Sequence, residues 1–201
     1  MNPPVFFFGV LIYFLSAASP STALEISKSG SVVVLKGSIV AGDEFEFKNF
    51  MNDPSNAAIK IVRLNSTGGK VIPARDIGRL IRSKSLTTYV DAKSDNCASA
   101  CTLLFGAGVK RHYANAQNIK DGVYGFKEQA VGLGYHEGNA PLSLDGNKYS
   151  GQATADMIAA YYEFGVQNAK DIITLAPPNK LYRLSSQKAL SLGIATSLSA
   201  P

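Results

Sequence analysis

Apolar residues follow two different periods along the chain, and the two periods alternate. A strand pattern over residues 59–64 ends in the turn Asn65-Ser66-Thr67-Gly68-Gly69. Beyond this turn, Ile77, Leu80 and Ile81 recur at helical spacing, which predicts a helix over residues 71–83. The alternation continues with predicted strands over residues 87–90, 109–114, 123–126 and 181–184, and predicted helices over residues 98–105, 152–164 and 186–192. Strands that alternate with helices indicate an α/β domain with a largely parallel sheet, covered on both sides.

Three further stretches complete the pattern. Residues 32–35 are apolar, and Phe45 and Phe47 alternate with charged neighbours, so both stretches are predicted to form strands. Residues 128–148, in contrast, are rich in glycine and asparagine and show no clear period. We expect this last segment to be a mobile loop over a site.

The first 23 residues differ in character from the rest, because they contain no Asp, Glu, Lys or Arg. Residues 5–15 form an apolar run of the length found in secretory signal peptides, which is too short to span a bilayer as a helix. The small residues Ser21-Thr22-Ala23 follow, so cleavage is expected before Leu24. We therefore expect a signal peptide over residues 1–23 and a single mature domain over residues 24–201, periplasmic or secreted and without a stable membrane span. The alternative is an uncleaved anchor.

Charge and composition narrow the classes of function. The chain has 20 Lys and Arg against 15 Asp and Glu, a net charge of +5, with only two His. Arg75, Arg79 and Arg82 share one predicted helix face, but this spacing is typical of a solvated face and aromatic interleaving is absent, so no nucleic-acid partner is expected. His112 and His136 follow no ligand spacing, so no metal is expected.

Cys97 and Cys101 are the only cysteines. An exported protein meets an oxidising compartment, where they could form a disulfide. If both residues were helical, their Cα atoms would lie near the upper end of the range that a disulfide tolerates. Two interpretations therefore stay open, a disulfide and a pair of small buried residues.

Two strand-to-helix turns carry residues suited to acyl transfer. In open α/β sheets, ligands bind where strands end and loops lead into helices. The first turn is Asn65 to Gly69, whose glycines let backbone N–H groups approach a substrate closely. The second contains Ser99, whose hydroxyl would lie near the N-terminus of the following helix beside the N–H of Ala100. The turns are about 30 residues apart, which predicts adjacent strands that face one crevice. The alternative role for Ser99 is that of a helix cap.

Several short motifs, in this order, resemble those of exported proteins of the Clp protease/crotonase-like superfamily. The resemblance extends from about Leu35 to Ala195 and rests on Leu35-x-Gly37-x-Ile39, Gly42-Asp43, Leu64-Asn65-Ser66-Thr67-Gly68-Gly69, Leu86-Thr87-Thr88-Tyr89-Val90, Cys97-Ala98-Ser99-Ala100-Cys101, Phe105-x-Ala107-Gly108 and Leu184-Ser185-Ser186-x-x-Ala189-x-x-x-Gly193. It implies the ClpP/crotonase fold, a spiral of ββα units with a mostly parallel sheet. It also implies that the chain can form a homo-oligomer.

The resemblance further implies site residues. Ser99 would be the nucleophile, and the N–H groups of Gly69 and Ala100, with Gly68 beside them, would form the oxyanion hole. The chain departs from the family where the other two members of the triad are expected. Lys127 stands where the resemblance expects the catalytic His, and residues 176–180 offer no acid where one is expected.

The identity of a general base therefore has several candidates. Ser-Lys dyads do catalyse acyl transfer, so Lys127 could act as the base if burial lowered its pKa from about 10.4. Otherwise Lys127 would be an ordinary solvated lysine in a degenerate site. His136, in the irregular segment, and His112 are the alternative bases.

Two functions follow. The first is an exported ClpP-like serine hydrolase or peptidase with a degenerate triad, which needs no cofactor and acts on a peptide or acyl substrate. The alternative is a catalytically inactive protein of the same fold that binds a peptide or protein partner in the same crevice.

Overall fold

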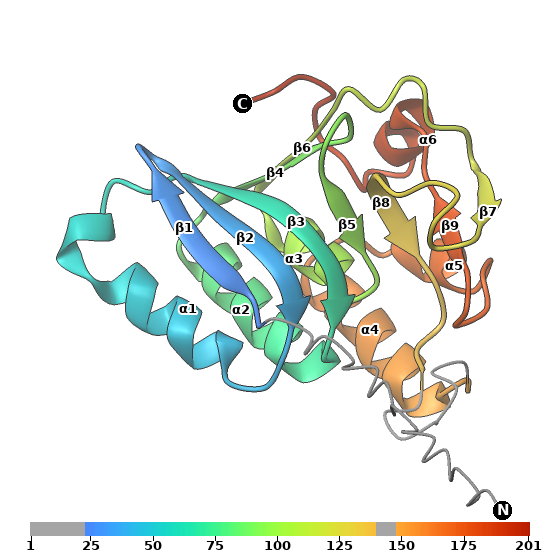
Figure 1. Cartoon of the computed structure of the whole chain (residues 1–201), viewed down its shortest axis with the longest axis horizontal. Helices are drawn as coiled ribbons and strands as arrows, with labels where there is room; N and C mark the ends of the chain where they lie inside the picture. The colour runs from blue at the N-terminus through green and yellow to red at the C-terminus, as the bar shows by residue number, and fades with distance from the viewer. Residues whose placement is uncertain (1–22, 140–147) are drawn as a thin grey trace, which may run out of the picture.

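One nine-stranded sheet passes through the part of the chain that the computed structural model describes, residues 23–139 and 148–201 (Figure 1). Its strands are β1 (Glu25–Ser29), β2 (Val32–Ile39), β3 (Ile61–Gly69), β4 (Thr87–Asp91), β5 (Asn96–Ala98), β6 (Lys110–Ala114), β7 (Gly122–Tyr124), β8 (Gly132–Tyr135) and β9 (Leu181–Arg183). The helices are α1 (Asp43–Asn52), α2 (Val71–Ser83), α3 (Cys101–Ala107), α4 (Gly151–Glu163), α5 (Ala169–Ile173) and α6 (Ser186–Ser191), with a short 3₁₀ turn at Pro54–Asn56.

Strand β3 is the branch point of the sheet. Its first residues pair in parallel with β4, from Ile61 opposite Thr87, whereas its last part pairs with β5 through Ser66 opposite Cys97. From β5 the sheet continues in parallel to β8, and then antiparallel to β9 and β7. The ends of β3, β5 and β8 therefore lie side by side, although they are far apart in the sequence.

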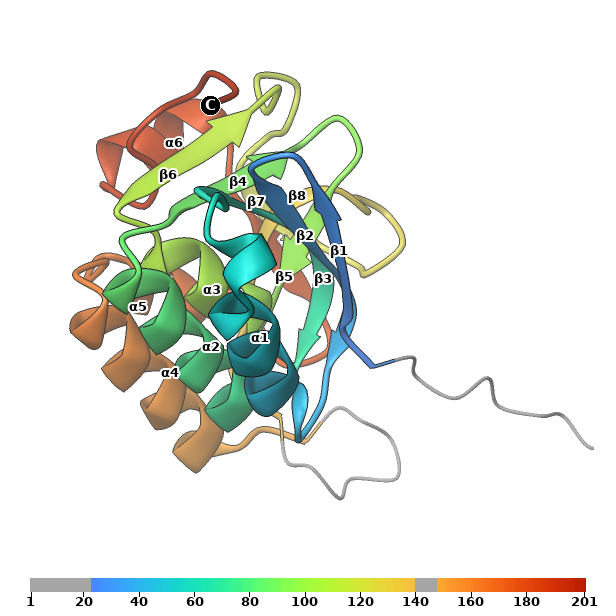
Figure 2. The same ribbon diagram turned by 90° about the vertical axis from the view of Figure 1, so that its left-hand side faces the viewer.

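Helices α1, α2 and α4 lie together on one side of the sheet (Figure 2). Inward-facing residues of the central strands are fully buried there, for example Leu35, Val62 and Leu64. Alternate residues such as Arg63 and Tyr89 are only half-buried on the opposite face. The prediction that the sheet is covered on both sides is therefore wrong for β2, β3 and β4. In these strands buried residues alternate with partly exposed ones, as in strands that have one face toward solvent.

The predicted strand around Phe45 and Phe47 is also wrong, because these residues belong to α1. Gly42, with φ of 103°, turns the chain into the helix, and Asp43, Glu44 and Glu46 lie in the first turn, where the helix dipole favours acidic side chains. Phe47 is buried while Phe45 is 64% exposed. Helical packing thus separates the two phenylalanines that an alternating pattern had grouped.

Other predictions agree closely with the structure. The helix predicted over residues 71–83 is α2, and the one predicted over residues 152–164 is α4. The Ser185 hydroxyl caps α6 by accepting a hydrogen bond from the Lys188 N–H, and Gly193 follows the helix with φ of 67°. The sequences of these helices either repeat an apolar face over several turns or contain residues that start and stop a helix.

The segment over residues 128–148 is not simply a loop. It contains β8, whose four residues are all buried. Two of them are glycines, so the strand presents only Leu133 and Tyr135 as apolar side chains and shows no period in the sequence. The rest of the expected mobile loop, residues 140–147, lies outside the described residues.

The expected signal peptide lies outside the described residues as well, apart from Ala23. Within residues 23–139 and 148–201, no helix has the length and apolar character needed to cross a membrane.

Candidate active site

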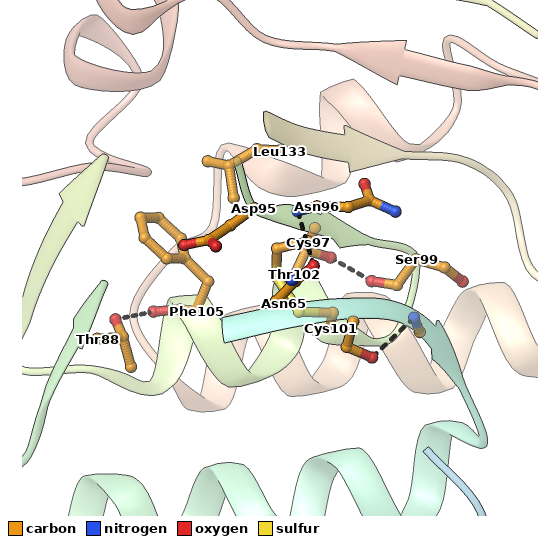
Figure 3. The surroundings of a disulfide bond; sticks show 12 residues. Asn65, Thr88, Asp95, Asn96, Cys97, Ser99, Cys101, Thr102, Phe105 and Leu133 are labelled. Atoms are coloured by element: carbon orange, nitrogen blue, oxygen red, sulfur yellow. Dashed lines mark hydrogen bonds between the residues drawn. A yellow bond between two sulfur atoms is a disulfide. The ribbon is translucent and has the colours of Figure 1, made fainter. Parts of the chain in front are cut away.

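Ser99 lies in a strained turn between β5 and α3 (Figure 3). Its φ of 54° falls in the left-handed region, which is unfavourable for a residue with a side chain. Hydrogen bonds hold the turn on both sides: the Ser99 N–H donates to the Gly134 carbonyl (2.8 Å), and the Ser99 carbonyl accepts from the Thr102 hydroxyl (2.6 Å). A strained residue held by its surroundings is typical of a functional position.

The alternative role of Ser99 as a helix cap is wrong. Helix α3 begins at Cys101, its N-cap residue is Ala100, and no side chain caps it. The Ala100 N–H belongs to the group of N–H donors at a helix start that have no partner within the helix. The Ser99 hydroxyl therefore does not cap the start of α3.

A disulfide joins Cys97 and Cys101 on either side of this turn (Figure 3). Cys97 lies in β5 and not in a helix, and its Cα atom is 5.2 Å from that of Cys101. Both cysteines are fully buried. The bond therefore fixes the distance between the end of the strand and the start of the helix, with Ser99 in between.

The two glycines at the end of β3 lie against neighbouring backbone. A Cβ atom on Gly68 would lie 2.7 Å from the Ser99 Cβ and 2.9 Å from the Ala100 nitrogen, and one on Gly69 would lie 2.1 Å from the Ile39 carbonyl oxygen. Both residues also have positive φ, 91° and 142°. Only glycine fits so close to neighbouring backbone. The turn at the end of β3 therefore lies directly against the turn that carries Ser99. The Gly68 N–H donates to the Ser66 hydroxyl (3.1 Å).

Ser99 and both glycines line a cavity of about 850 Å³. Its walls come from the segment after β2, the start of α2 and the start of α4, and they are largely apolar: Ile39, Val40, Ala41, Val71, Ile72, Pro73, Phe126 and Ala153. The polar lining residues beside Ser99 and the glycines are Ser38, Thr67, Lys70, His136, Asn139, Ser150, Gln152 and Asp156.

His136 is the titratable residue that the structure brings to this cavity from the strand next to Ser99. It directly follows β8, which pairs with β5 through Leu133 opposite Cys97 and Gly134 opposite Ala98. Its side chain is almost fully buried, and burial lowers the pKa of the imidazole below its ordinary value of 6.5. Its Nδ1 lies 2.5 Å from the Glu137 carbonyl oxygen, an acceptor, so Nδ1 carries the proton and Nε2 keeps its lone pair.

Lys127 and His112 occupy other positions: Lys127 follows Phe126 of the cavity wall, and His112 belongs to β6. Lys127 is exposed in the turn that follows β7, and among the described strands β7 pairs with β9 alone, at the edge of the sheet. It does not line the cavity. The His112 Nδ1 contacts the carbonyl of Ser199 (2.8 Å) on the opposite part of the sheet. An aromatic residue followed directly by a histidine, Tyr135-His136, was the signal in the sequence that could have identified the histidine after β8.

The segment where the resemblance expects an acid does lie beside His136. The Glu137 N–H donates to the Ala176 carbonyl (3.0 Å), but residues 176–180 contain no carboxylate. Asp156 of α4 reaches the cavity from another wall. In the described part of the chain, no three His, Cys, Asp or Glu side chains form a group that could hold a metal ion.

No protein-family model and no curated protein sequence matches the chain. Among solved structures, a variant of the 1510-N membrane-bound stomatin-specific protease is similar with a TM-score of 0.58 and 16% identity, over 83% of this chain and 77% of the protease. Another variant of that protease, in complex with a substrate peptide, has a TM-score of 0.58 and 15% identity, over 83% and 73% of the two chains. A variant of ClpP1 from Listeria monocytogenes has a TM-score of 0.51 and 16% identity, over 86% and 92%. Together with the mostly parallel sheet, these similarities confirm the predicted fold class: the chain has the ClpP/crotonase fold.

Proposed function

We propose that the protein is an exported serine hydrolase that cleaves peptides, with Ser99 as nucleophile and His136 as general base. One observation carries the proposal: Ser99 and His136 follow adjacent parallel strands and line the same cavity, with Gly68 and Gly69 beside them. The buried disulfide agrees with action in an oxidising compartment.

In this proposal, Nε2 of His136 takes the proton of the Ser99 hydroxyl as Oγ attacks the substrate carbonyl carbon. The N–H groups of Gly69 and Ala100 donate to the oxyanion that forms. His136 then gives its proton to the leaving amine, and water hydrolyses the acyl-enzyme by the reverse sequence of proton transfers. The Glu137 carbonyl holds the imidazole in the correct tautomer, a role for which no carboxylate is present in residues 176–180.

The volume and the lining of the cavity agree with a peptide as the substrate. Its volume and mostly apolar walls are in the range of sites that enclose side chains of a ligand. One similar structure, at low identity, was determined with a substrate peptide. An acyl substrate would use the same nucleophile, and the fold allows a homo-oligomer.

Active-site labelling tests the proposal. The chain over residues 24–201 would be treated with a fluorophosphonate, which modifies activated serines, beside Ser99→Ala, His136→Ala and Lys127→Ala variants. We expect no labelling of Ser99→Ala, labelling slower by roughly 100-fold or more for His136→Ala, and an unchanged rate for Lys127→Ala. Ser38→Ala is the matched control, because Ser38 lines the same cavity without facing His136 from an adjacent strand.

The same experiment distinguishes the hydrolase from the alternative function, a catalytically inactive protein that binds a peptide or protein partner. The missing carboxylate beside Ala176 favours a protein that binds peptides without cleaving them. Absence of Ser99-dependent labelling between pH 6 and 10 would exclude the hydrolase. Peptide binding that is blocked by bulky substitutions of Gly68 would then support the binding protein. Slow fluorophosphonate labelling that is lost in Lys127→Ala would instead identify Lys127 as the base.

A further inference from the structure

The buried carboxylate of Asp43 lies beside the residue that is expected to become the amino terminus. Asp43 is 5% exposed and Leu24 is 7% exposed. The Leu24 nitrogen lies 3.4 Å from Asp43 Oδ2, which also accepts a hydrogen bond from the Val40 N–H at 2.7 Å. A carboxylate that is removed from water in this way is normally paired with a cation.

In the part of the chain that the structure describes, no Lys or Arg forms an ion pair with Asp43, because every ion pair there involves another carboxylate. The other charged groups of β1, β2 and α1 have different partners or are exposed. Lys28 donates to the Ser55 carbonyl and to Asn56 Oδ1, and Glu44 accepts from the Gly42 N–H at 3.0 Å. The exposed groups are Glu25, Lys36, Glu46 and Lys48. In the uncleaved chain both donors to Asp43, Val40 and Leu24, offer only a neutral amide.

We infer that Asp43 is the binding site for the α-ammonium group that cleavage between Ala23 and Leu24 creates. Hydrolysis breaks this peptide bond, leaves the carboxylate on Ala23 and gives Leu24 a charged amino group at the position of its present nitrogen. The neutral, 3.4 Å contact then becomes a charge-assisted hydrogen bond to a buried carboxylate. The inference rests on the export part of the proposed function, but not on catalysis.

The proposed ion pair between Leu24 and Asp43 is connected to the candidate active site through Val40. The same oxygen of Asp43 holds the Val40 N–H, and residues 38–41 form one wall of the cavity. Ile39, in that wall, accepts a hydrogen bond from the Lys70 N–H (2.8 Å) and lies against Gly69. A charged partner on Asp43 would therefore add support to the wall that holds the glycine turn.

The test compares amino termini. Four proteins would be prepared: residues 24–201 with a free Leu24 amine, the same chain with that amine acetylated, and both with Asp43→Asn. The free amine should titrate above its usual pKa of about 7.7–8.0, as followed by ¹⁵N NMR of Leu24. A raised pKa in the folded protein means that the added stability is complete below pH 7.7 and is lost as pH rises through the folded pKa.

Thermal unfolding between pH 6 and 10 should therefore show a higher Tm for the free amine than for the acetylated chain at pH 6–7, and equal values near pH 10. In the Asp43→Asn background the two termini should give equal Tm values throughout. Glu44→Gln is the matched control, and it should keep the difference. A Leu24 amine with an ordinary pKa would overturn the inference, and so would a Tm difference between the free and acetylated termini that persists unchanged in the Asp43→Asn chains. So would a mass spectrum of the exported protein that shows another first residue; none of these outcomes depends on hydrolase activity.

Discussion

At the scale of single residues, the candidate site depends on positions where a side chain is absent or held in an unusual conformation. Gly68 lies against the Ser99 turn, and Ser99 itself has a left-handed backbone. The base, in the proposed mechanism, is the one histidine that burial keeps neutral beside this turn. Each of these features can be changed by one substitution.

Replacing Gly68 by alanine should disturb the Ser99 turn directly. The added Cβ would meet Ala98, Ser99 and Ala100, at 2.5, 2.7 and 2.9 Å, in a backbone with positive φ. We expect a loss of roughly 1–3 kcal/mol in the free energy of unfolding and a large loss of fluorophosphonate labelling. Gly30→Ala is the control, because Gly30 also has positive φ but nothing lies within 4 Å of its Cβ position. Equal labelling by both variants would contradict the proposed close approach.

The pH dependence of activity should identify the base. Because burial lowers the pKa of His136, kcat/KM should be constant near neutral pH and fall only as pH decreases below 6.5. The free energy of unfolding should decrease over the same range, since the unfolded state takes up the proton first; above pH 6.5 this contribution does not change. His136→Gln should remove that part of the stability profile. Activity that still increases between pH 8 and 10 would point to a lysine instead.

At the scale of elements, the disulfide between β5 and α3 sets the geometry of the strand-to-helix turn. Strand β5 has only three residues, and α3 is short and fully buried. Pairing with β3 and β8 holds β5 in the sheet, while the Cys97–Cys101 bond holds the helix start against it. The turn that carries Ser99 is thus closed at both ends.

Removing this bond should lower both stability and reactivity. For the double variant Cys97→Ala/Cys101→Ala, loop-closure entropy for so short a loop gives a loss of about 2 kcal/mol, measured by urea unfolding. Fluorophosphonate labelling should be slower at temperatures where circular dichroism shows the variant to be folded. A folded variant that labels at the original rate would show that the disulfide stabilises the domain without positioning Ser99.

At the scale of the whole molecule, long periodic elements could be predicted from the sequence, whereas short strands and their neighbours could not. Helix α2 was predicted with its observed limits because three turns repeat the same apolar face. Strand β8 was missed because half of its residues are glycine, and α1 was assigned to a strand because its phenylalanines alternate. The candidate site shows the same difference. The prediction that the glycine turn and the serine turn face one crevice agrees with the structure. His136, however, was only an alternative base in the sequence, and only the structure places it after the strand next to β5.

The sequence alone determined the α/β class, the turn at Gly68 and Gly69, and Ser99 as the candidate nucleophile, because these depend on local period and on the special backbone of glycine. Only the tertiary structure decided that His136, 37 positions beyond Ser99, lines the same cavity. It also decided that Cys97 and Cys101 are bonded and that Asp43 is buried beside Leu24. The disulfide depends on Cys97 lying in a strand, which the sequence did not indicate. The positions of His136 and Asp43 depend on the pairing of β5 with β8 and on the hydrogen bonds that join Asp43 to Leu24 and Val40. Such long-range contacts leave no period in the sequence, since short buried strands are fixed by their neighbours in the sheet.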